Sequence, residues 1–524
     1  MQKNKRKYIL ILCAISMFIV GRPALTYGTT IVPKTIRVGL RSAYAGKSSI
    51  AIKNTQLQVG YERQDRFQSE ETLSSPTGFL LKANTGNYYA DKNTFSTYTE
   101  ANKLLSNYKS QGTSGLVAYK GPGNWQVYLE KNLGQTSPVS NTGSEIIVYD
   151  GAGNPMIFCD GAKTGFAGIN QGYSFNLTSL ANGSYRGWFE FVRRGSTITA
   201  VNIVDHEEYL YGVIAAEMPA SWHIEALKAQ AVAARSMSIY QSRKYISDGY
   251  NVCDTVYTQV YKGFSGEYES TNRAVDETRG MVVTHNGKIA ETLFFSTSGG
   301  YTEDPQYVWG NQVAYLKAVP DPYETDPEMK PWTRTITLAE IDKCLRNQKV
   351  NIGPAKGLRI NSYTPAGRVN ELEIIGTSGT HKLTRENIRT FFSATNGGSL
   401  RSRMFTIGKQ TQAPIINTRP IEDIVVYRGE RPSYVISASG KIRPVGNTLV
   451  VQGAGGQAIY GGSQGSNQGN NQGPQTQYGD IVISGRGYGH GVGMSQSGAK
   501  GMAQAGYSYD EIIKYYYQGV ELQK

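Results

Sequence analysis

The sequence predicts an α+β protein that is rich in β-strands and contains a few helices. Three observations carry this prediction. The 524 residues include 60 glycines and 36 tyrosines, a composition typical of strand-rich and turn-rich proteins. Short runs of alternating apolar and polar residues recur from Thr35 onwards. Residues 224–238 instead repeat their apolar side chains at three- and four-residue spacing, which indicates a helix.

The first 28 residues have the pattern of an export signal. Four basic residues open it: Lys3, Lys5, Arg6 and Lys7. Residues 8–20 then form an uncharged, largely apolar run that is shorter than the ~20 residues of a membrane span. We therefore expect an extracytoplasmic protein, secreted or wall-associated. An uncleaved membrane anchor is the alternative, and it would be the only part in contact with the membrane.

The overall charge suggests an anionic environment. The formal net charge is +13, and residues 1–28 hold five basic residues and no acid, so the remainder carries +8. A mildly basic exported protein suits a polyanionic surface such as a bacterial wall, with simple solubility as the alternative. The basic residues are dispersed and no base-stacking motif is present, so nucleic acid is not an expected partner.

The N-terminal half is predicted to contain a β-rich region, residues 29–87, followed by a small α/β insertion, residues 88–140. Within the insertion, residues 95–112 have helical spacing, and Gly121-Pro122-Gly123 marks the turn of a hairpin. This order of helix, strand, turn and strand resembles half of a sporulation-related repeat (SPOR) domain, a module that binds glycan strands lacking peptides. An ordinary α/β insertion is the alternative.

Residues 141–524 are predicted to form the main domain. Strand patterns over 144–204 precede a helix that starts near Glu207, and Ser221 is placed to cap a second helix. Residues 461–479 are rich in glycine, glutamine and asparagine, a composition typical of a flexible loop. The segment after this loop is expected to pack back onto the main domain, and its last helix starts with a capping box of Ser508 and Glu511.

Glu217 is the leading candidate for a catalytic residue. It ends an apolar run, Tyr211–Ala216, and precedes Met218-Pro219. Apolar surroundings disfavour the charged form of a carboxyl group and raise its pKa, and a helix C-terminus has the same effect. Glu217 is therefore suited to act as a general acid. A glutamate that merely ends a helix is the alternative.

Two further segments carry candidate sugar-binding residues. In Ser296–Glu303, glycines allow close approach of the backbone and hydroxyl groups can hydrogen-bond a sugar, although a tight turn with a capping hydroxyl would look similar. Residues 485–496 lack the spacing of a nucleotide-binding loop. Their alternate glycines surround His490, which could face a sugar, orient the acid or be structural, and the segment ends at Gln496.

Four segments together resemble the stage II sporulation protein D (SpoIID/LytB) family: residues 207–235, 253–263, 294–319 and 485–520. The resemblance implies a β-rich domain whose few helices form a glycan cleft. It also implies a lytic transglycosylase that cleaves peptide-free peptidoglycan glycan strands and leaves 1,6-anhydro ends. Glu217 matches the catalytic glutamate, while Thr302, Glu303 and Tyr315 match residues that line the cleft.

The family resemblance leaves the mechanism and the partners open in two respects. Glu303 is the second candidate for the acid–base role, and a non-catalytic wall-binding protein or amidase enhancer is the alternative function. Glycan strands are the expected ligand, and other wall hydrolases are conceivable partners. We expect Glu217 to act as a single acid and base, with His490 and Gln496 binding substrate beside the three cleft residues.

No metal or cofactor is expected. Many family members hold a zinc ion with two cysteines and a histidine near Cys253, but here Thr258 stands where the second cysteine is expected. One cysteine does not make a zinc site, so Cys253 is predicted to be a small buried residue. Three widely spaced cysteines remain after residue 28, which does not suggest a disulfide framework.

Overall fold

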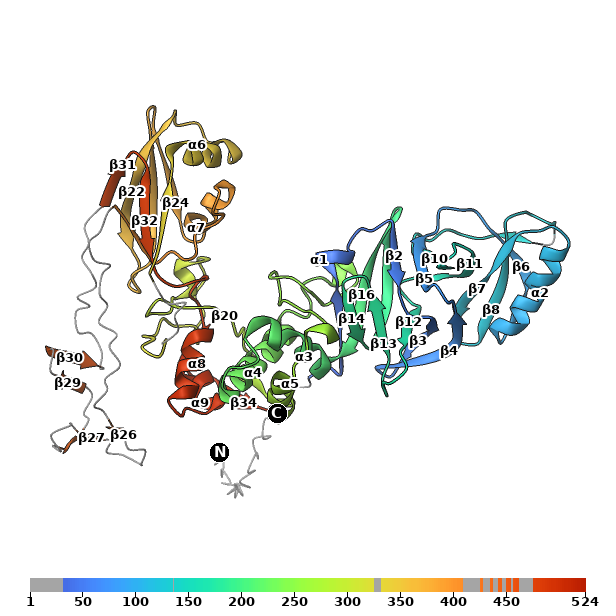
Figure 1. The fold of residues 1–524 in the computed structure, drawn as a ribbon, viewed down its shortest axis with the longest axis horizontal. Helices are drawn as coiled ribbons and strands as arrows, with labels where there is room; N and C mark the ends of the chain where they lie inside the picture. Colours follow the sequence, from blue (N-terminus) through green and yellow to red (C-terminus); the bar gives the residue numbers. More distant parts are fainter. Residues whose placement is uncertain are drawn as a thin grey trace, which may run out of the picture.

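The computed structural model describes residues 32–134, 136–324, 331–408 and 475–524, together with short strands between residues 425 and 460. The described regions form an elongated molecule (Figure 1). A strand-rich N-terminal region lies at one end, a helical region in the middle and a mixed lobe at the other end. The structure is α+β and rich in strands, which confirms the predicted fold class. The predicted export signal lies outside the described residues.

The first sheet joins the start of the described chain to the strand that leads into the helical region. β1 (Thr35–Gly39) and β16 (Thr197–Asp205) pair antiparallel, from Thr35 opposite Asp205 to Gly39 opposite Val201. The predicted boundaries at 87 and 140 therefore do not separate sheets, because strands from both sides share one core. The seven strands lie in the order β17 (Val252–Cys253), β1 (Thr35–Gly39), β16 (Thr197–Asp205), β15 (Trp188–Arg194), β12 (Gly165–Ile169), β3 (Gln56–Arg63) and β4 (Arg66–Ser74).

The second sheet contains the predicted α/β insertion. Its helix, predicted over residues 95–112, is α2 (Tyr98–Ser110), which starts at a capping box of Thr97 and Glu100. Its hairpin turns between Gly121 and Asn124, as predicted. The insertion is not a separate sheet, because β7 also pairs with β11. The eight strands lie in the order β2 (Ser49–Ile52), β5 (Phe79–Ala83), β10 (Glu145–Asp150), β11 (Pro155–Asp160), β7 (Gly115–Gly121), β8 (Asn124–Leu129), β6 (Tyr89–Phe95) and β9 (Ser137–Pro138). Short elements complete this region: α1 (Arg41–Tyr44), β13 (Leu177–Leu180) and β14 (Gly183–Arg186).

The helical region is built around α4 (Ile224–Tyr240). Its many small, buried alanines let neighbouring helices pack closely on several sides. The predicted cap Ser221 is wrong: His223 Nδ1 accepts the hydrogen bond of Glu225 N–H at 3.3 Å. Ser221 lies in a turn closed by Trp222 N–H and Pro219 O at 3.0 Å, so the helix begins later. α4 contacts four helices: α3 (His206–Glu217), α5 (Glu269–Glu277), α8 (Gln496–Gln504) and α9 (Tyr509–Tyr516).

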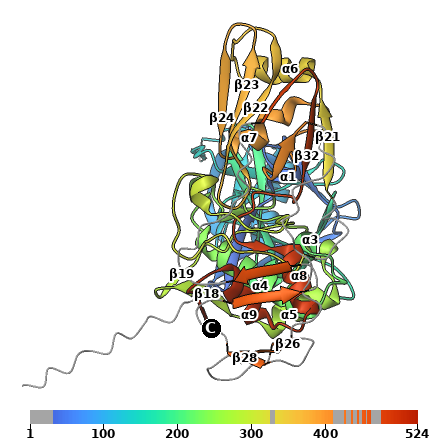
Figure 2. The same ribbon diagram turned by 90° about the vertical axis from the view of Figure 1, so that its left-hand side faces the viewer.

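The C-terminal segment packs back onto the helical region, as predicted. β34 (Glu521–Gln523) pairs with β18 (Val282–His285), which also pairs with β19 (Lys288–Ile289). β33 (Met494–Ser495) pairs in parallel with β20 (Phe294–Phe295). Ser508 and Glu511 form the predicted capping box of α9. Figure 2 shows α8 and α9 beside α4 in this region. Within the described residues, the connections include the short 3-10 helices η1 (Ile246–Asp248), η2 (Phe264–Gly266) and η3 (Pro305–Tyr307).

Residues 332–407 and 475–485 form a lobe with a hydrophobic core of its own. The sequence did not distinguish this lobe within the predicted domain 141–524. One sheet orders its strands β21 (Trp332–Ile336), β32 (Ile481–Gly485) and β25 (Phe405–Ile407). The other orders β24 (Thr380–Thr384), β23 (Val369–Gly376), β22 (Ala355–Tyr363) and β31 (Gln475–Tyr478). Three helices complete the lobe: α6 (Leu338–Asn347), α7 (Asn387–Thr390) and the 3-10 helix η5 (Phe391–Ala394).

The predicted loop over 461–479 ends earlier than expected. Residues 475–478 form β31, which pairs with β22 and places Tyr478 opposite Gly357. Residues 475–478 form a strand because β22 offers an edge to pair with, and strand formation depends more on a pairing partner than on local composition. Residues 461–474 lie outside the described residues. Between 425 and 460 the short strands are β26 (Val425–Val426), β27 (Tyr434–Ile436), β28 (Ile442–Pro444), β29 (Leu449–Gly453) and β30 (Gly456–Tyr460).

Among the described residues, no helix has both the length and the apolar character needed to cross a lipid bilayer.

Candidate functional site

Glu217 is the last residue of α3. The helix ends there because Met218 adopts an extended backbone with φ −131° and ψ 140°. Met218 precedes Pro219, and a residue before proline is disfavoured in the helical conformation. The N-terminus of α3 is held by Asp205, whose carboxylate accepts hydrogen bonds from the backbone of Glu207 and Glu208. The local sequence therefore places the Glu217 carboxyl at a helix C-terminus.

The surroundings of Glu217 favour its protonated form. Burial raises the pKa of the Glu217 carboxyl above its ordinary value. Two neutral groups oppose this rise in pKa: the backbone N–H of Val260, which donates to Oε1 at 3.1 Å, and the side chain of Gln496. Within the described part of the chain, Glu217 forms no ion pair. The carboxyl is thus held by neutral donors in a partly buried site.

Gln496 reaches Glu217 from a distant part of the sequence. It is the first residue of α8 and is only 7% exposed. The parallel pairing of β33 with β20 sets the start of α8, and the Ser495 side chain caps the helix by accepting from Gly498 N–H. Among the described residues, Gln496 Nε2 has no partner with good hydrogen-bond geometry. The Gln496 amide therefore lies near enough to the Glu217 carboxyl to lower its pKa, although its Nε2 forms no well-aligned hydrogen bond with a described residue.

A cation–π contact lies on the same helix, one turn beyond Gln496. The Lys500 ammonium lies 4.9 Å from the centre of the Trp222 ring. Trp222 belongs to the turn that follows Glu217, so this contact fixes α8 against the segment that carries the acid. Sequence reasoning missed both the Trp222 contact and the Val260 amide. The resemblance of residues 253–263 to the family was the only available signal for Val260.

Thr302 and Tyr315 hold backbone segments in place. Thr302 is 1% exposed, and its Oγ1 accepts from Val319 N–H at 2.7 Å. The Tyr315 hydroxyl accepts from Glu291 N–H at 2.7 Å, and its ring lies 5.0 Å from the ring of His285. No described contact joins either side chain to Glu217. Their assignment to a sugar-binding cleft stays a prediction.

Glu303 lies in a buried junction between the helical region and the lobe. Its Oε2 accepts from Thr364 Oγ1 at 2.6 Å, and its backbone N–H donates to Gly491 O at 2.8 Å. Burial raises the pKa of Glu303, while the charges of Arg368 and Arg403 and the Thr364 hydrogen bond lower it. In the described structure, no contact links Glu303 to Glu217. Its carboxylate is therefore engaged in holding two parts of the protein together.

Arg368 is a junction residue that sequence reasoning missed. It is 1% exposed and donates from the lobe to Thr302 O at 3.1 Å and to Ser298 O at 2.8 Å. A side chain at Gly491 would meet the Arg368 guanidinium, since a Cβ there would lie 2.6 Å from Arg368 Cζ. The φ of +90° at Gly491 also favours glycine. These contacts hold the lobe against two glycine-containing segments, residues 296–303 and 485–496.

His490 is half-buried between two aromatic rings. The ring centres of Phe295 and Trp309 lie 5.5 Å and 5.2 Å from its own. Its Nδ1 accepts from Val492 N–H at 3.0 Å. Burial lowers the pKa of His490 to about 3, with further lowering by Arg389 and Arg368. The ring is therefore neutral near pH 7 and cannot serve as a general acid there.

Cys253 is fully buried in the first sheet. Its Sγ lies 3.2 Å from Thr255 Oγ1 and 3.5 Å from Thr258 Oγ1. Within the described residues, no group of three or more histidine, cysteine, aspartate or glutamate side chains is placed to hold a metal ion. The prediction that Cys253 is a small buried residue is confirmed by its burial.

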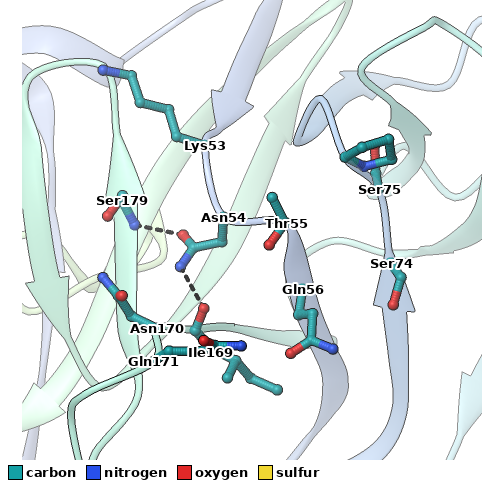
Figure 3. A pocket seen from close by; sticks show the side chains of 11 residues that line it. Lys53, Asn54, Thr55, Gln56, Ser74, Ser75, Ile169, Asn170, Gln171 and Ser179 are labelled. Atoms are coloured by element: carbon teal, nitrogen blue, oxygen red, sulfur yellow. Dashed lines mark hydrogen bonds between the residues drawn. The ribbon is translucent and has the colours of Figure 1, made fainter.

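A cavity of about 730 Å³ lies in the N-terminal region, away from these residues (Figure 3). Asn54 fixes part of its wall by donating to Ile169 O at 3.1 Å and accepting from Ser179 N–H at 2.7 Å. Among the described residues that line it, Lys53 is the one with a titratable side chain. The described residues that line the cavity therefore include no carboxyl group that could protonate a glycosidic oxygen.

Two regions of the chain match family models. Residues 194–285 match the family described as Stage II sporulation protein. Residues 306–422 match a domain described as a domain of unknown function (DUF8618). The first region contains Glu217 and Val260, and the second contains Trp309 and Arg368.

Three relatives resemble the chain over about three fifths of its length. The amidase enhancer of Bacillus subtilis is 35% identical over 314 residues, which cover 60% of this chain and 40% of that relative. The stage II sporulation protein D of Bacillus subtilis is 30% identical over 338 residues, covering 62% of this chain and 76% of that relative. An uncharacterized protein of Brachyspira hyodysenteriae is 29% identical over 339 residues, covering 64% and 72%. The match therefore spans less than half of the amidase enhancer.

Proposed function

The chain belongs to the stage II sporulation protein D family, and on this premise we propose that it is a lytic transglycosylase of peptidoglycan glycan strands. Family membership and the relative named amidase enhancer support a role connected with the cell wall. The proposal extends this role to an exported enzyme that acts on the wall outside the cytoplasmic membrane. Its substrate would be glycan strands without stem peptides.

The environment of Glu217 is the observation that carries the proposal. A lytic transglycosylase needs one carboxyl group that can donate a proton and then accept another. Burial raises the pKa of Glu217, and the two groups that lower it, Val260 N–H and the Gln496 side chain, are neutral. Such a carboxyl keeps a proton more readily than a carboxylate paired with a cation, so it is suited to both steps.

The proposed reaction uses no water and conserves all atoms. Protonated Glu217 donates its proton to the glycosidic oxygen, and the bond from that oxygen to the anomeric carbon breaks. The 6-hydroxyl oxygen of the same sugar then attacks the anomeric carbon, and its proton returns to the Glu217 carboxylate. One product carries a 1,6-anhydro ring and the other a new hydroxyl end. This differs from glycoside hydrolysis, in which a second carboxylate acts as nucleophile or activates water.

The alternative is a non-catalytic wall protein that stimulates an amidase. The 35% identity to a relative named amidase enhancer favours this alternative. In that case Glu217 would contribute to binding or to the fold, and its raised pKa would have no catalytic use.

Cleavage of purified glycan strands tests the proposal. Unmodified protein and the Glu217→Gln variant are incubated with peptide-free strands, and mass spectrometry detects 1,6-anhydro ends. We expect such ends from the unmodified protein and none from the variant, because the amide cannot donate the required proton. Circular dichroism of both proteins controls for folding.

Glu303→Gln is the matched carboxyl variant, since Glu303 also has a raised pKa but lies in the junction. We expect it to cleave strands once its folding is verified. Cleavage by Glu217→Gln together with loss in Glu303→Gln would move the acid to Glu303. Absence of cleavage by the unmodified protein on several glycan forms would favour the amidase-enhancing alternative.

A further inference from the structure

A surface groove of about 580 Å³ lies beside α5. We name it the Tyr268 groove. Its volume is within the range of small-molecule sites. The residues that matter for its chemistry are Arg186, Phe264, Glu267, Tyr268, Asn272 and Asp276.

The Tyr268 groove is connected to the segment that carries Glu217. Val260, whose N–H donates to Glu217 Oε1, lies in the connection that follows β17 and runs through η2 to Tyr268. On the other side, Ser270 Oγ donates to Ala220 O at 2.7 Å, three residues after Glu217. The chain on either side of Tyr268 is therefore connected to Glu217 itself or to the turn that follows it.

The charge of Arg186, which lines the groove, is neutralised by neighbouring carboxylates. The Arg186 guanidinium lies 4.1 Å from the centre of the Phe175 ring and 5.0 Å from that of Phe264. It donates to both oxygens of Glu267, at 2.7 and 2.9 Å, and to Glu208 at 3.3 Å. Paired in this bidentate way, Arg186 is a fixed support for the aromatic rings and not a free cation.

Tyr268 has no evident structural role at its position. It precedes α5, where serine, threonine, aspartate or asparagine normally caps a helix, yet no side-chain cap is formed. The residue is 60% exposed, so packing does not account for it either. One turn further, Asn272 Nδ2 donates to Glu267 at 2.9 Å, and no partner for Asn272 Oδ1 exists in the described structure.

An exposed aromatic ring beside amide and carboxylate groups fits a sugar. The apolar face of a pyranose can stack on Tyr268, while its hydroxyl and acetamide groups can hydrogen-bond the polar side chains. The charges of the lining largely cancel, because Arg273 stands beside Glu269 and Asp276 is paired with Arg279 at 2.7 Å, so the groove suits a neutral sugar better than a polyanionic wall polymer. We propose that the Tyr268 groove is a second sugar-binding subsite, which holds an N-acetylhexosamine unit of the glycan strand at a distance from Glu217. The ligand class rests on the function proposed above.

Binding to an inactive full-length protein tests this subsite separately from catalysis. Isothermal titration of the Glu217→Gln variant with a hexamer of N-acetylglucosamine measures the affinity. Adding Tyr268→Ala should weaken binding about tenfold, the typical effect of an aromatic contact of ~1.4 kcal/mol. Tyr268→Phe keeps the ring and should retain most of the affinity. Tyr478→Ala removes a tyrosine that is 66% exposed on the lobe, so it serves as the matched control and should change nothing.

The outcomes separate the two proposals. Binding that depends on Tyr268 supports the subsite even if the unmodified protein releases no anhydro ends, a result that would sink only the catalytic proposal. Equal affinities of the Tyr268→Ala and Tyr478→Ala proteins would overturn the subsite even if cleavage is observed. Undetectable binding of the hexamer by the Glu217→Gln protein would overturn it as well.

Discussion

The buried ion pair between Glu207 and Arg235 should be a large contributor to the integrity of the helical region. Arg235 is fully buried and Glu207 is 6% exposed. Arg235 Nε and Nη2 donate to the Glu207 carboxylate over 2.6–3.2 Å. Nη1 also donates to Met281 O, and Nη2 to Val275 O. The pair joins the first turn of α3 to α4, and α3 carries Glu217 at its other end.

Arg235→Met removes the charge and keeps a side chain of similar length. The Glu207 carboxylate would then be buried with one donor left, the Gly280 N–H at 3.0 Å. Removing one partner of a buried pair typically lowers the free energy of unfolding by about 3–5 kcal/mol. With a urea dependence of about 2–3 kcal/mol per M, the unfolding midpoint of this region should fall by roughly 1–2.5 M. Far-ultraviolet circular dichroism during urea titration measures the shift.

Two further variants test the physical reason for this loss. Glu207→Gln with Arg235→Met removes both charges, so the double variant should be more stable than Arg235→Met alone. Arg194→Met breaks an exposed pair with Asp248, whose side chains are 61% and 39% exposed, and should cost about 0–1 kcal/mol. A loss below about 1 kcal/mol in Arg235→Met, or a double variant less stable than the single one, would refute the reasoning.

Three other predictions concern the candidate site. Because Gln496 lowers the raised pKa of Glu217, Gln496→Met should raise that pKa further. The pH at which the cleavage rate declines on the basic side should then be higher than in the unmodified protein, and an unchanged or lower pH would contradict this prediction. The His490 pKa of about 3 lies below the ordinary value, so the unfolded chain binds more protons. His490 should therefore destabilise the folded protein increasingly as pH falls from about 6.5 towards 3. In nuclear magnetic resonance its ring resonances should not titrate between about pH 5 and 8, and a titration midpoint near 6.5 would contradict the lowered pKa. If Cys253 holds no zinc, a chelator should leave the melting temperature and strand cleavage unchanged, and a loss of either would show that a metal is needed.

Local patterns predicted several elements correctly because those elements depend on nearby residues. The predicted capping box of Ser508 with Glu511 joins groups three residues apart. The α4 cap was predicted wrongly, since the turn from Pro219 to Trp222 moved the helix start to a histidine. A competing local hydrogen bond of this kind is hard to recognise from residue types alone.

Long-range pairing decided the division of the chain. β1 and β16 are separated by more than 150 residues, yet they pair along their lengths. No local pattern specifies a strand's partner, so the predicted boundaries at 87 and 140 cut through shared sheets. The lobe that contains α6 was likewise not distinguished, because its strands resemble those of the rest of the chain and its core becomes evident only on folding.

The sequence by itself determined that a glutamate stands at the end of a helix. An apolar run followed by Met218-Pro219 is a local signal, and the restriction on a residue before proline acts within that dipeptide. Only the tertiary structure decided the partners of Glu217. Val260 lies 43 residues further along, and Gln496 reaches the carboxyl because β33 pairs with β20. The same packing engages the other predicted carboxylate, Glu303, in the junction with the lobe. Burial and neighbours set the pKa of a carboxyl, and both arise when distant segments pack together.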